Sequence, residues 1–229
     1  MSGNAWVIGK AGGIGSACVQ GLTDDGFTVH ASDRPDEDIT QPGVATAVAE
    51  KIAVSGPLMA AVHTIGMSGR RLGDGPTSTC EDAAWDEVVR VNLTSAFYFA
   101  RACLNYCSPG ASVVFIGSAL AKGLDGDFLT VAYRVAKSGM IPLMEAAAYE
   151  GARKGIRFNI VAPALVDTPM AARALGNDEI IARFSELMPL TGRPSSANEV
   201  AAAVRWLVSD QALQTTGAII PVDGGWLLQ

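Results

Sequence analysis

Histidine and cysteine, the side chains that most often bind zinc, are scarce in this 229-residue chain. The only histidines are His30 and His63, and the cysteines are Cys18, Cys80, Cys103 and Cys107. No two cysteines form a Cys-x-x-Cys pair, although Cys103 and Cys107 have the spacing of neighbours on a helix. We therefore expect no metal site, and buried free thiols in place of disulfides.

The chain also lacks a long apolar run and an excess of positive charge. No stretch of about 18 apolar residues occurs, so no segment is expected to span a membrane. The apolar stretch that begins at Ala5 has no basic region before it and no cleavage site after it, so no signal peptide is expected. The formal net charge of -6 argues against nucleic acids and anionic membranes as partners. A cytoplasmic protein is the expectation that fits these absences.

Hydrophobic residues make up 49% of the chain and charged residues 17%, as in folded globular proteins. The length is enough for one large α/β domain, and no repeat or linker divides it. We therefore predict a single domain over residues 1–229. Its predicted strands cover residues 5–8, 27–33, 58–65, 111–116, 157–161 and 218–222, and its predicted helices include residues 16–22, 41–54, 82–106 and 198–208, the last capped near Ser196.

A glycine-rich turn follows the first predicted strand and leads into the first helix. Strand, glycine turn and helix are the opening of a dinucleotide-binding βαβ unit. Glycine lets the backbone approach a pyrophosphate, and the helix N-terminus offers free N–H groups. The spacing Gly9-x-x-x-Gly13-x-Gly15 differs from the usual G-x-G-x-x-G, and any tight βα turn can use glycine. Because the strand and the helix are both in place, cofactor binding is the favoured interpretation.

Asp33 ends the second predicted strand, 18 residues after Gly15. An acid there can hydrogen-bond both ribose hydroxyls of an adenosine, and its charge would repel a 2′-phosphate. Arg34 follows directly and could bind such a phosphate. Because Asp33 stands at the strand end itself, NAD is favoured over NADP, with an ordinary loop aspartate as the alternative.

Tyr133 and Lys137 lie four residues apart, a spacing that places both side chains on one face of a helix. A free phenol has a pKa of about 10, and a nearby ammonium group favours the phenolate. The pair is therefore a candidate proton-transfer device, with Tyr133 as the acid or base and Lys137 lowering its pKa. On spacing alone, a solvent-facing helix pair would be the simpler interpretation.

Ser118 and Asn92 are the other polar candidates. Ser118 follows the strand over residues 111–116, and α/β enzymes place working groups at carboxyl ends of strands. Asn92 falls inside the long helix predicted over residues 82–106, where an asparagine side chain competes for backbone hydrogen bonds. That cost indicates a role for Asn92, with a local hydrogen bond at a partly exposed position as the alternative.

Three connecting segments bear on the site. Between Asp33 and Asp38 there is no room for a crossover helix, so residues 38–40 are expected to form a turn or a short strand end. Residues 168–190 are rich in helix and apolar on one face, so a segment over about residues 168–195 is expected to pack on the core and cover the substrate as a lid. Arg70 and Arg71 are expected to be solvated loop charges, with anion ligands as the less favoured alternative.

Together these residues resemble the classical branch of the short-chain dehydrogenase/reductase superfamily over nearly the whole chain. Ile8 replaces the threonine usual before the glycine turn, and residues 63–66 keep only the glycine of Asn-Asn-Ala-Gly. Ser118 lies 15 residues before Tyr133, where the usual gap is 13, so a longer loop is expected. The resemblance implies that the catalytic residues are Asn92, Ser118, Tyr133 and Lys137. It implies a cofactor site made of Gly9, Gly13, Ile14, Gly15, Asp33, Asp38, Ile39, Gly66, Tyr133, Lys137, Pro163, Val166 and Thr168.

The resemblance implies a Rossmann fold, with a doubly wound parallel sheet of six to seven strands and helices on both faces. It implies an NAD-dependent oxidoreductase that interconverts a secondary alcohol and a ketone, and a homodimer or homotetramer. A dinucleotide-binding sensor or scaffold without turnover is the alternative, although such proteins usually lose the tyrosine or the lysine. The expected pocket is apolar, which favours a substrate with apolar bulk. Its expected residues are Leu120, Phe128, Leu129, Met170 and Phe184.

Overall fold

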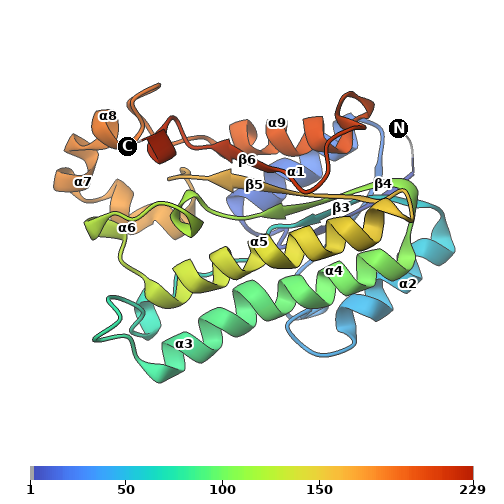
Figure 1. Cartoon of the computed structure of the whole chain (residues 1–229), viewed down its shortest axis with the longest axis horizontal. Helices are drawn as coiled ribbons and strands as arrows, with labels where there is room; N and C mark the ends of the chain where they lie inside the picture. The colour runs from blue at the N-terminus through green and yellow to red at the C-terminus, as the bar shows by residue number, and fades with distance from the viewer. Residues whose placement is uncertain (1–2, 229) are drawn as a thin grey trace.

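The computed structural model describes residues 3–228, in which six parallel strands form one sheet flanked by helices (Figure 1). The strands are β1 (Asn4–Ile8), β2 (Thr28–Ser32), β3 (Leu58–His63), β4 (Cys107–Ile116), β5 (Arg157–Pro163) and β6 (Ile219–Val222). Their order is β2-β1-β3-β4-β5-β6, and all neighbouring pairs are parallel. The predicted fold is confirmed, with six strands.

The helices cover both faces of the sheet. α1 (Gly13–Asp24) and α9 (Ala197–Val208) pack against each other on one face. α2 (Val44–Ser55), α4 (Ser95–Tyr106) and α5 (Val131–Ala152) cover the other face. The chain runs from β1 to β2 in one direction and then returns past β1 to β3, so α1 and α2 lie on opposite faces. This reversal opens a crevice at the carboxyl ends of β1 and β3.

The last crossover differs in hand from the others. The chain moves from β5 to β6 in the same direction as from β3 to β4, yet α9 lies on the face opposite α4 and α5. Parallel crossovers are right-handed with few exceptions, and this one is left-handed. The connection is long, and its first part forms the segment predicted as a lid.

Strand β1 shows why short, continuous apolar runs in the sequence predict buried parallel strands. Successive side chains of a strand point to opposite faces. Trp6 and Ile8 belong to the core under α2, α4 and α5, whereas Ala5 and Val7 belong to the core under α1 and α9. A strand covered on both faces is apolar throughout, so its sequence does not alternate.

The connection after β2 is short, as predicted. Residues 33–43 form turns and contain neither a strand nor a helix, and residues 38–40 are part of these turns. β2 is therefore the edge strand of the sheet, and Asp33 lies at its carboxyl end.

The helix predicted over residues 82–106 is continuous but not uniform. It consists of α3 (Asp82–Val89), a π-helical turn η2 (Arg90–Thr94) and α4. In η2 the Ser95 N–H bonds the carbonyl of Arg90, five residues earlier, in place of the usual four. Asn92 lies in this turn.

The segment between β5 and α9 folds into short helices that form a small core of their own. They are η5 (Pro169–Ala171), α6 (Ala172–Leu175), α7 (Asp178–Ala182) and α8 (Phe184–Leu187). Leu165, Ile180, Leu187 and Trp226 are among the buried residues of that core. α9 then begins at the predicted cap, because Ser196 and Glu199 form a reciprocal capping box.

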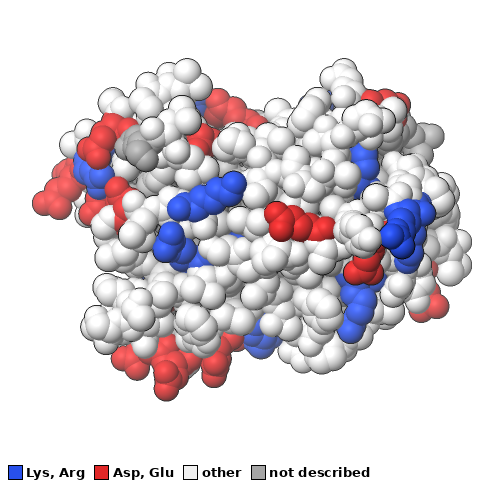
Figure 2. All heavy atoms as spheres, viewed as in Figure 1, with Lys and Arg blue, Asp and Glu red and all other residues white. Residues whose placement is uncertain are grey.

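Shorter turns complete the described chain. They are η1 (Arg70–Leu72), η3 (Ala119–Ala121), η4 (Gly126–Phe128), η6 (Asp210–Ala212) and η7 (Trp226–Leu228). On the face shown in Figure 2, acidic side chains gather over α3 and beside α7, while lysine or arginine atoms lie between α6 and α5. Within residues 3–228 no helix has the length and apolar character needed to cross a membrane.

Candidate active site

Ser118, Tyr133 and Lys137 line one cavity of about 470 Å³ at the carboxyl ends of the strands. Tyr133 lies in the first turn of α5 and Lys137 one turn later, with its Nζ 5.8 Å from the centroid of the tyrosine ring. Ser118 lies two residues after the end of β4, and an interaction with its side chain lowers the pKa of the Tyr133 phenol. The structure therefore brings together three residues that are separated by up to 19 positions (137 − 118) in the sequence.

Burial alters the proton affinity of both helix residues. Burial raises the pKa of Tyr133, and the interaction with the Ser118 side chain offsets this only in part. Burial lowers the pKa of Lys137 from 10.5 to about 7. The sequence interpretation, in which Lys137 lowers the pKa of Tyr133, is therefore wrong for the chain alone. Desolvation of the phenolate dominates the electrostatic environment of Tyr133.

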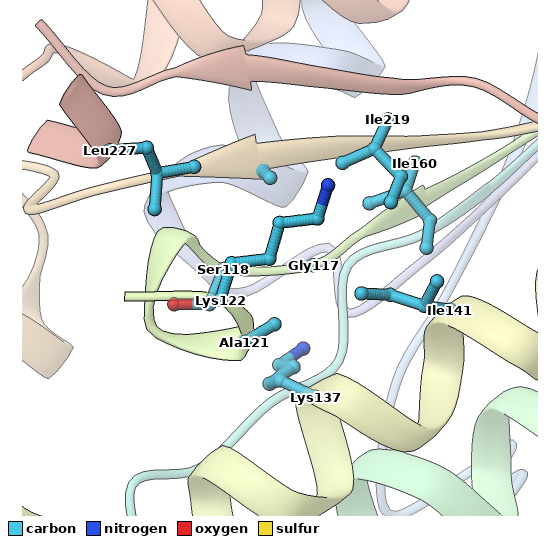
Figure 3. Close-up of a pocket in the computed structure, with 10 residues that line it drawn as sticks. Gly117, Ser118, Ala121, Lys122, Lys137, Ile141, Ile160, Ile219 and Leu227 are labelled. Atoms are coloured by element: carbon cyan, nitrogen blue, oxygen red, sulfur yellow. The ribbon is translucent and has the colours of Figure 1, made fainter. Parts of the chain in front are cut away.

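A hydrogen bond to the last residue of β4 fixes the Lys137 side chain. Its side chain is 3% exposed and its Nζ donates a 2.8 Å hydrogen bond to the Ile116 carbonyl. Figure 3 shows Lys137 and Ser118 beside a second, much smaller cavity of about 10 Å³, which the Lys122 side chain enters from the turn after β4. Lys137 thus has its ammonium group fixed between the two cavities.

Asn92 does not line the large cavity but lies directly behind it, fully buried. Its Nδ2 donates to the carbonyls of Val88 (2.9 Å) and Met67 (3.0 Å), and its Oδ1 accepts from the Met67 N–H (3.2 Å). A Cβ added at Gly66 would lie 3.2 Å from Asn92 Oδ1 and 3.5 Å from Lys137 Nζ. Asn92 and Lys137 therefore both lie close to Gly66, and a side chain at that position would press against the Asn92 amide.

The alternative interpretation of Asn92 is right in one part only: the local hydrogen bond exists, because Val88 is four residues earlier on the helix, but the residue is fully buried and not partly exposed. Its pairing with Met67 satisfies a partly buried N–H and a partly buried carbonyl in the loop after β3. Asn92 thereby ties the π-helical turn to that loop.

Asp74 is a site residue that the sequence analysis missed. Its carboxylate accepts hydrogen bonds from the backbone N–H groups of Ala132 and Tyr133, each at 3.0 Å, and the residue is 5% exposed. It occupies the N-terminus of α5, where negative charge is favourable. A loop aspartate 59 residues before Tyr133 (133 − 74) carries no local signal for this role.

The glycine turn forms a close-packed cradle. A Cβ at Gly15 would lie 2.1 Å from the Gly9 carbonyl oxygen, and a Cβ at Gly13 would lie 2.7 Å from Thr168 Cγ2. Thr64, which the sequence analysis passed over, donates a 2.6 Å hydrogen bond to the Ile8 carbonyl and holds the start of the turn. No side chain within residues 3–228 caps the N-terminus of α1. These residues fit a pyrophosphate, because the approach is open and the helix N–H groups lack a side-chain acceptor.

Asp33 lies at the edge of this cradle. Its Oδ2 accepts a 2.9 Å hydrogen bond from the Ala11 N–H, inside the glycine turn, and its Oδ1 accepts one of 2.9 Å from the Arg34 N–H. Each carboxylate oxygen has a second lone pair, so Asp33 can still accept from a ribose.

Asp38 and Ile39 lie in the turns after Asp33. Burial would raise the pKa of Asp38, but hydrogen bonds from Thr40 and the charges of Arg34 and Arg90 lower it overall. Ile39 is fully buried in the core, so only its backbone can meet an adenine.

His63 takes the place where the family usually has asparagine. It is fully buried beside Phe99 and Phe115, and burial, followed by the charge of Lys137, lowers its pKa to about 3. Its Nε2 lies 2.9 Å from Ser95 Oγ, which itself donates to the Val91 carbonyl, so Nε2 carries the proton. His63 is therefore a neutral core residue.

The cavity wall agrees in part with the predicted pocket. Leu120, Phe128 and Met170 line it, whereas Leu129 and Phe184 are not among its lining residues. Among the predicted cofactor residues, those that line it are Ile14, Gly66, Tyr133, Lys137, Pro163, Val166 and Thr168. The longer loop after Ser118 forms η3 and η4 and contributes Leu120 and Phe128 to the wall.

Residues 37–227 match the family model described as enoyl-(acyl carrier protein) reductase. An uncharacterized short-chain type dehydrogenase/reductase, y4vI, of Sinorhizobium fredii is 33% identical over 96% of the chain. The chain spans only 43% of the length of that relative. The acetoacetyl-CoA reductase of Allochromatium vinosum is 29% identical, with 98% of both chains covered.

Solved structures of dehydrogenases have the same fold as this chain. A short-chain type dehydrogenase/reductase from Mycobacterium ulcerans superposes with a TM-score of 0.91 at 27% identity, over 99% of this chain and 90% of the other. An NAD(P)-dependent relative from Beutenbergia cavernae, solved with bound NADP, gives a TM-score of 0.87 at 28% identity, over 99% of this chain and 97% of the other.

Proposed function

This chain belongs to the classical short-chain dehydrogenase/reductase superfamily, and we propose that it is an NAD(H)-dependent oxidoreductase that interconverts a secondary alcohol and a ketone. The observation that carries the proposal is the meeting of Ser118, Tyr133 and Lys137 on one cavity beside the glycine cradle. The acetoacetyl-CoA reductase relative, named for the reduction of a ketone, supports the same reaction type.

The bound dinucleotide would supply or accept a hydride at the substrate carbon. The cradle of Gly9, Gly13 and Gly15 and the N-terminus of α1 would hold its pyrophosphate, with Thr168 above. Pro163, Val166 and Gly66 would border its nicotinamide end. Lys137 would bond the nicotinamide ribose, and Asn92 would anchor a water between Lys137 and solvent.

Tyr133 would transfer the hydroxyl proton. Because burial raises its pKa, the phenol is protonated at neutral pH and can donate to the oxygen of a ketone. In the oxidative direction Tyr133 must first lose that proton, which its raised pKa opposes in the chain alone. Ser118, which lines the same cavity, would hold the substrate oxygen beside the phenol.

Asp33 would select NAD. Its carboxylate is fixed by the Ala11 N–H at the edge of the cradle, where a 2′-phosphate would meet a negative charge. The bound NADP in the Beutenbergia cavernae relative shows that this family also contains NADP-binding members, so the choice depends on Asp33 and Arg34.

We further propose that the protein is a cytoplasmic homodimer or homotetramer, and that residues 168–195 form a lid over the substrate.

The test is NAD⁺ and NADP⁺ reduction, followed by absorbance over a panel of secondary alcohols, with Tyr133→Phe beside the parent. The loss of a positioned acid/base should lower turnover by about 10²–10⁴-fold while NADH binding persists. Tyr149→Phe, an exposed tyrosine on the same helix, is the matched control. Near-full activity of Tyr133→Phe would overturn the assignment, and tight NADH binding without turnover in any assay would favour a dinucleotide sensor.

A further inference from the structure

The large cavity carries an excess of positive charge in a chain of net charge -6. Arg70, Arg71, Arg173 and Lys137 line it, and no aspartate or glutamate is among the described residues of its wall. Lys137 belongs to the catalytic group. The three arginines lie on two segments, η1 after β3 and α6 in the lid, which are about 100 residues apart in the sequence (173 − 71 = 102).

Arg70 and Arg173 converge on one acceptor. Arg70 donates a 3.0 Å hydrogen bond to the Asp127 carbonyl, and Arg173 donates one of 2.9 Å to the same carbonyl. Two guanidinium groups at one oxygen repel each other, and burial together with the charge of Arg173 lowers the pKa of Arg70. Arg70, expected from the sequence to be a solvated loop charge, is instead half-buried.

The acids nearest to this pair are engaged elsewhere. The carboxylates of Asp125 and Asp127 pair with Arg183 of the lid, the Asp125 contact at 2.8 Å. The Asp74 carboxylate, whose charge partly offsets the lowered pKa of Arg70, is bonded to the N-terminus of α5. A guanidinium has five N–H donors, so both arginines keep donors beyond the Asp127 bond.

The wall beside the arginines is aromatic. The Arg173 guanidinium lies 5.7 Å from the centroid of the Phe128 ring, which meets the Trp226 ring edge-on at 5.1 Å. Leu120 and Met170 extend the same wall. The cavity thus combines a cationic patch with an apolar surface on the side of the loop that follows Ser118.

We propose that the substrate is an apolar alcohol or ketone that carries a carboxylate, and that Arg70 and Arg173 bind this group. The proposal rests on the function proposed above and names its substrate class. A carboxylate has two oxygens, one for each guanidinium, and its charge relieves their repulsion. A cofactor phosphate is the competing ligand, but the cradle for it lies at the N-terminus of α1, whereas both arginines are bonded to the loop after β4.

The test uses two ketones that differ only in charge, 4-oxocyclohexanecarboxylate and 4-oxocyclohexanecarboxamide. Each ketone is titrated by calorimetry into the protein with and without NAD⁺. Reduction of a ketone needs NADH, so a ketone is not turned over in the presence of NAD⁺. The carboxylate should bind at least about tenfold more tightly than the carboxamide, because a hydrogen bond to a charged group is stronger than a neutral one. In Arg70→Met/Arg173→Met the two dissociation constants should become equal within about threefold.

Three controls separate binding of the anion from other roles. Arg153→Met removes an exposed arginine that stacks on Tyr149 near the far end of α5, and should keep the preference. Arg70→Lys/Arg173→Lys keeps both positive charges but lacks the planar guanidinium with its paired N–H donors. This variant should therefore keep part of the preference for the carboxylate. The NADH dissociation constant should stay unchanged in all variants. A role confined to holding the Asp127 carbonyl would weaken both ketones equally.

The proposal is overturned if the two ketones bind equally to the parent, if the preference survives the double Met variant, or if no carboxylate binding is detected up to about 10 mM. A parallel loss of NADH affinity would assign the arginines to the cofactor instead. Charge preference without any NADH-dependent turnover would overturn the proposed reaction and leave the anion site standing. Turnover without charge preference would overturn the anion site alone.

Discussion

The Asp74 carboxylate binds the backbone of Tyr133, with Oδ2 accepting its N–H at 3.0 Å while Oδ1 accepts the N–H of Ala132. The side chain that would transfer the proton is thus held at its own main chain by a residue from a different loop. Two N–H groups at the start of α5, one buried and one partly buried, depend on this one carboxylate.

Asp74→Asn should lower both stability and turnover. The amide can accept for only one of the two N–H groups, and an unpaired buried N–H costs about 1–3 kcal/mol, measurable by urea unfolding. Displacement of Tyr133 should lower kcat by about tenfold or more, with KM and the NADH dissociation constant little changed. Asp82→Asn, an exposed acid in the first turn of α3, is the control and should change neither. An unaltered kcat in Asp74→Asn would show that Asp74 is structural only.

Asn92→Ala should destabilise the fold through Met67. The substitution leaves the Met67 N–H and carbonyl without their partner, and we expect a loss of roughly 2 kcal/mol in the free energy of unfolding. Asn105→Ala, at an exposed position of the adjoining α4, should change it by less than about 0.5 kcal/mol. Equal effects of the two substitutions would mean that the pairing with Met67 contributes nothing.

Asp33→Ser should shift the cofactor preference toward NADP. Removal of one negative charge beside a 2′-phosphate changes the interaction by ~1–4 kcal/mol, so the ratio of kcat/KM for NADP⁺ to that for NAD⁺ should rise about tenfold or more. Asp36→Ser removes an exposed acid from the same turn and is the matched control. A ratio that moves equally in both variants would mean that net charge, and not Asp33 itself, sets the preference.

Lys137 should make stability rise with pH. Its pKa is about 7 in the folded chain against 10.5 ordinarily, so between these values the unfolded chain binds more protons than the folded chain. Stability therefore increases as pH rises from 7 toward 10, by about 1 kcal/mol per pH unit relative to Lys137→Met, which has no such proton. Urea unfolding at pH 6, 8 and 9 would measure this, with Lys51→Met, an exposed lysine on α2, as the control. Parallel pH profiles of parent and Lys137→Met would contradict the lowered pKa.

The sheet and the meeting of Ser118, Tyr133 and Lys137 could be predicted because their signals are local. Strands such as β1 are short and apolar throughout, the glycine turn is contiguous, and Tyr133 and Lys137 share one helical turn. The predicted bounds differ mainly at element ends, as for β4, which begins at Cys107 and not at Ala111. The assignments of catalytic and cofactor roles to these residues remain predictions.

The features that the sequence could not reveal depend on contacts between distant segments. The partner of Asn92 is the Met67 backbone, and the partner of Asp74 is the start of α5, so neither pairing has a pattern in the chain. The pKa of Tyr133 depends on how deeply α5 is buried. The four-residue spacing between Tyr133 and Lys137 carries no information about that burial. Arg70 and Arg173 meet only because the loop after β4 offers both the Asp127 carbonyl.

The π-helical turn at Arg90–Thr94 lets one continuous helix serve two different neighbours. Each residue added to a helix rotates the rest of that helix by about 100°, so the extra residue in this turn sets α3 and α4 out of phase. α3 packs through Val88 beside Ala132 of α5, while α4 buries Phe99 against the sheet. A deletion of one residue here would restore regular winding and turn one of these two surfaces away from its partner. The single irregular turn therefore sets the rotation between the surface that packs on α5, the helix of Tyr133, and the surface that packs on the sheet.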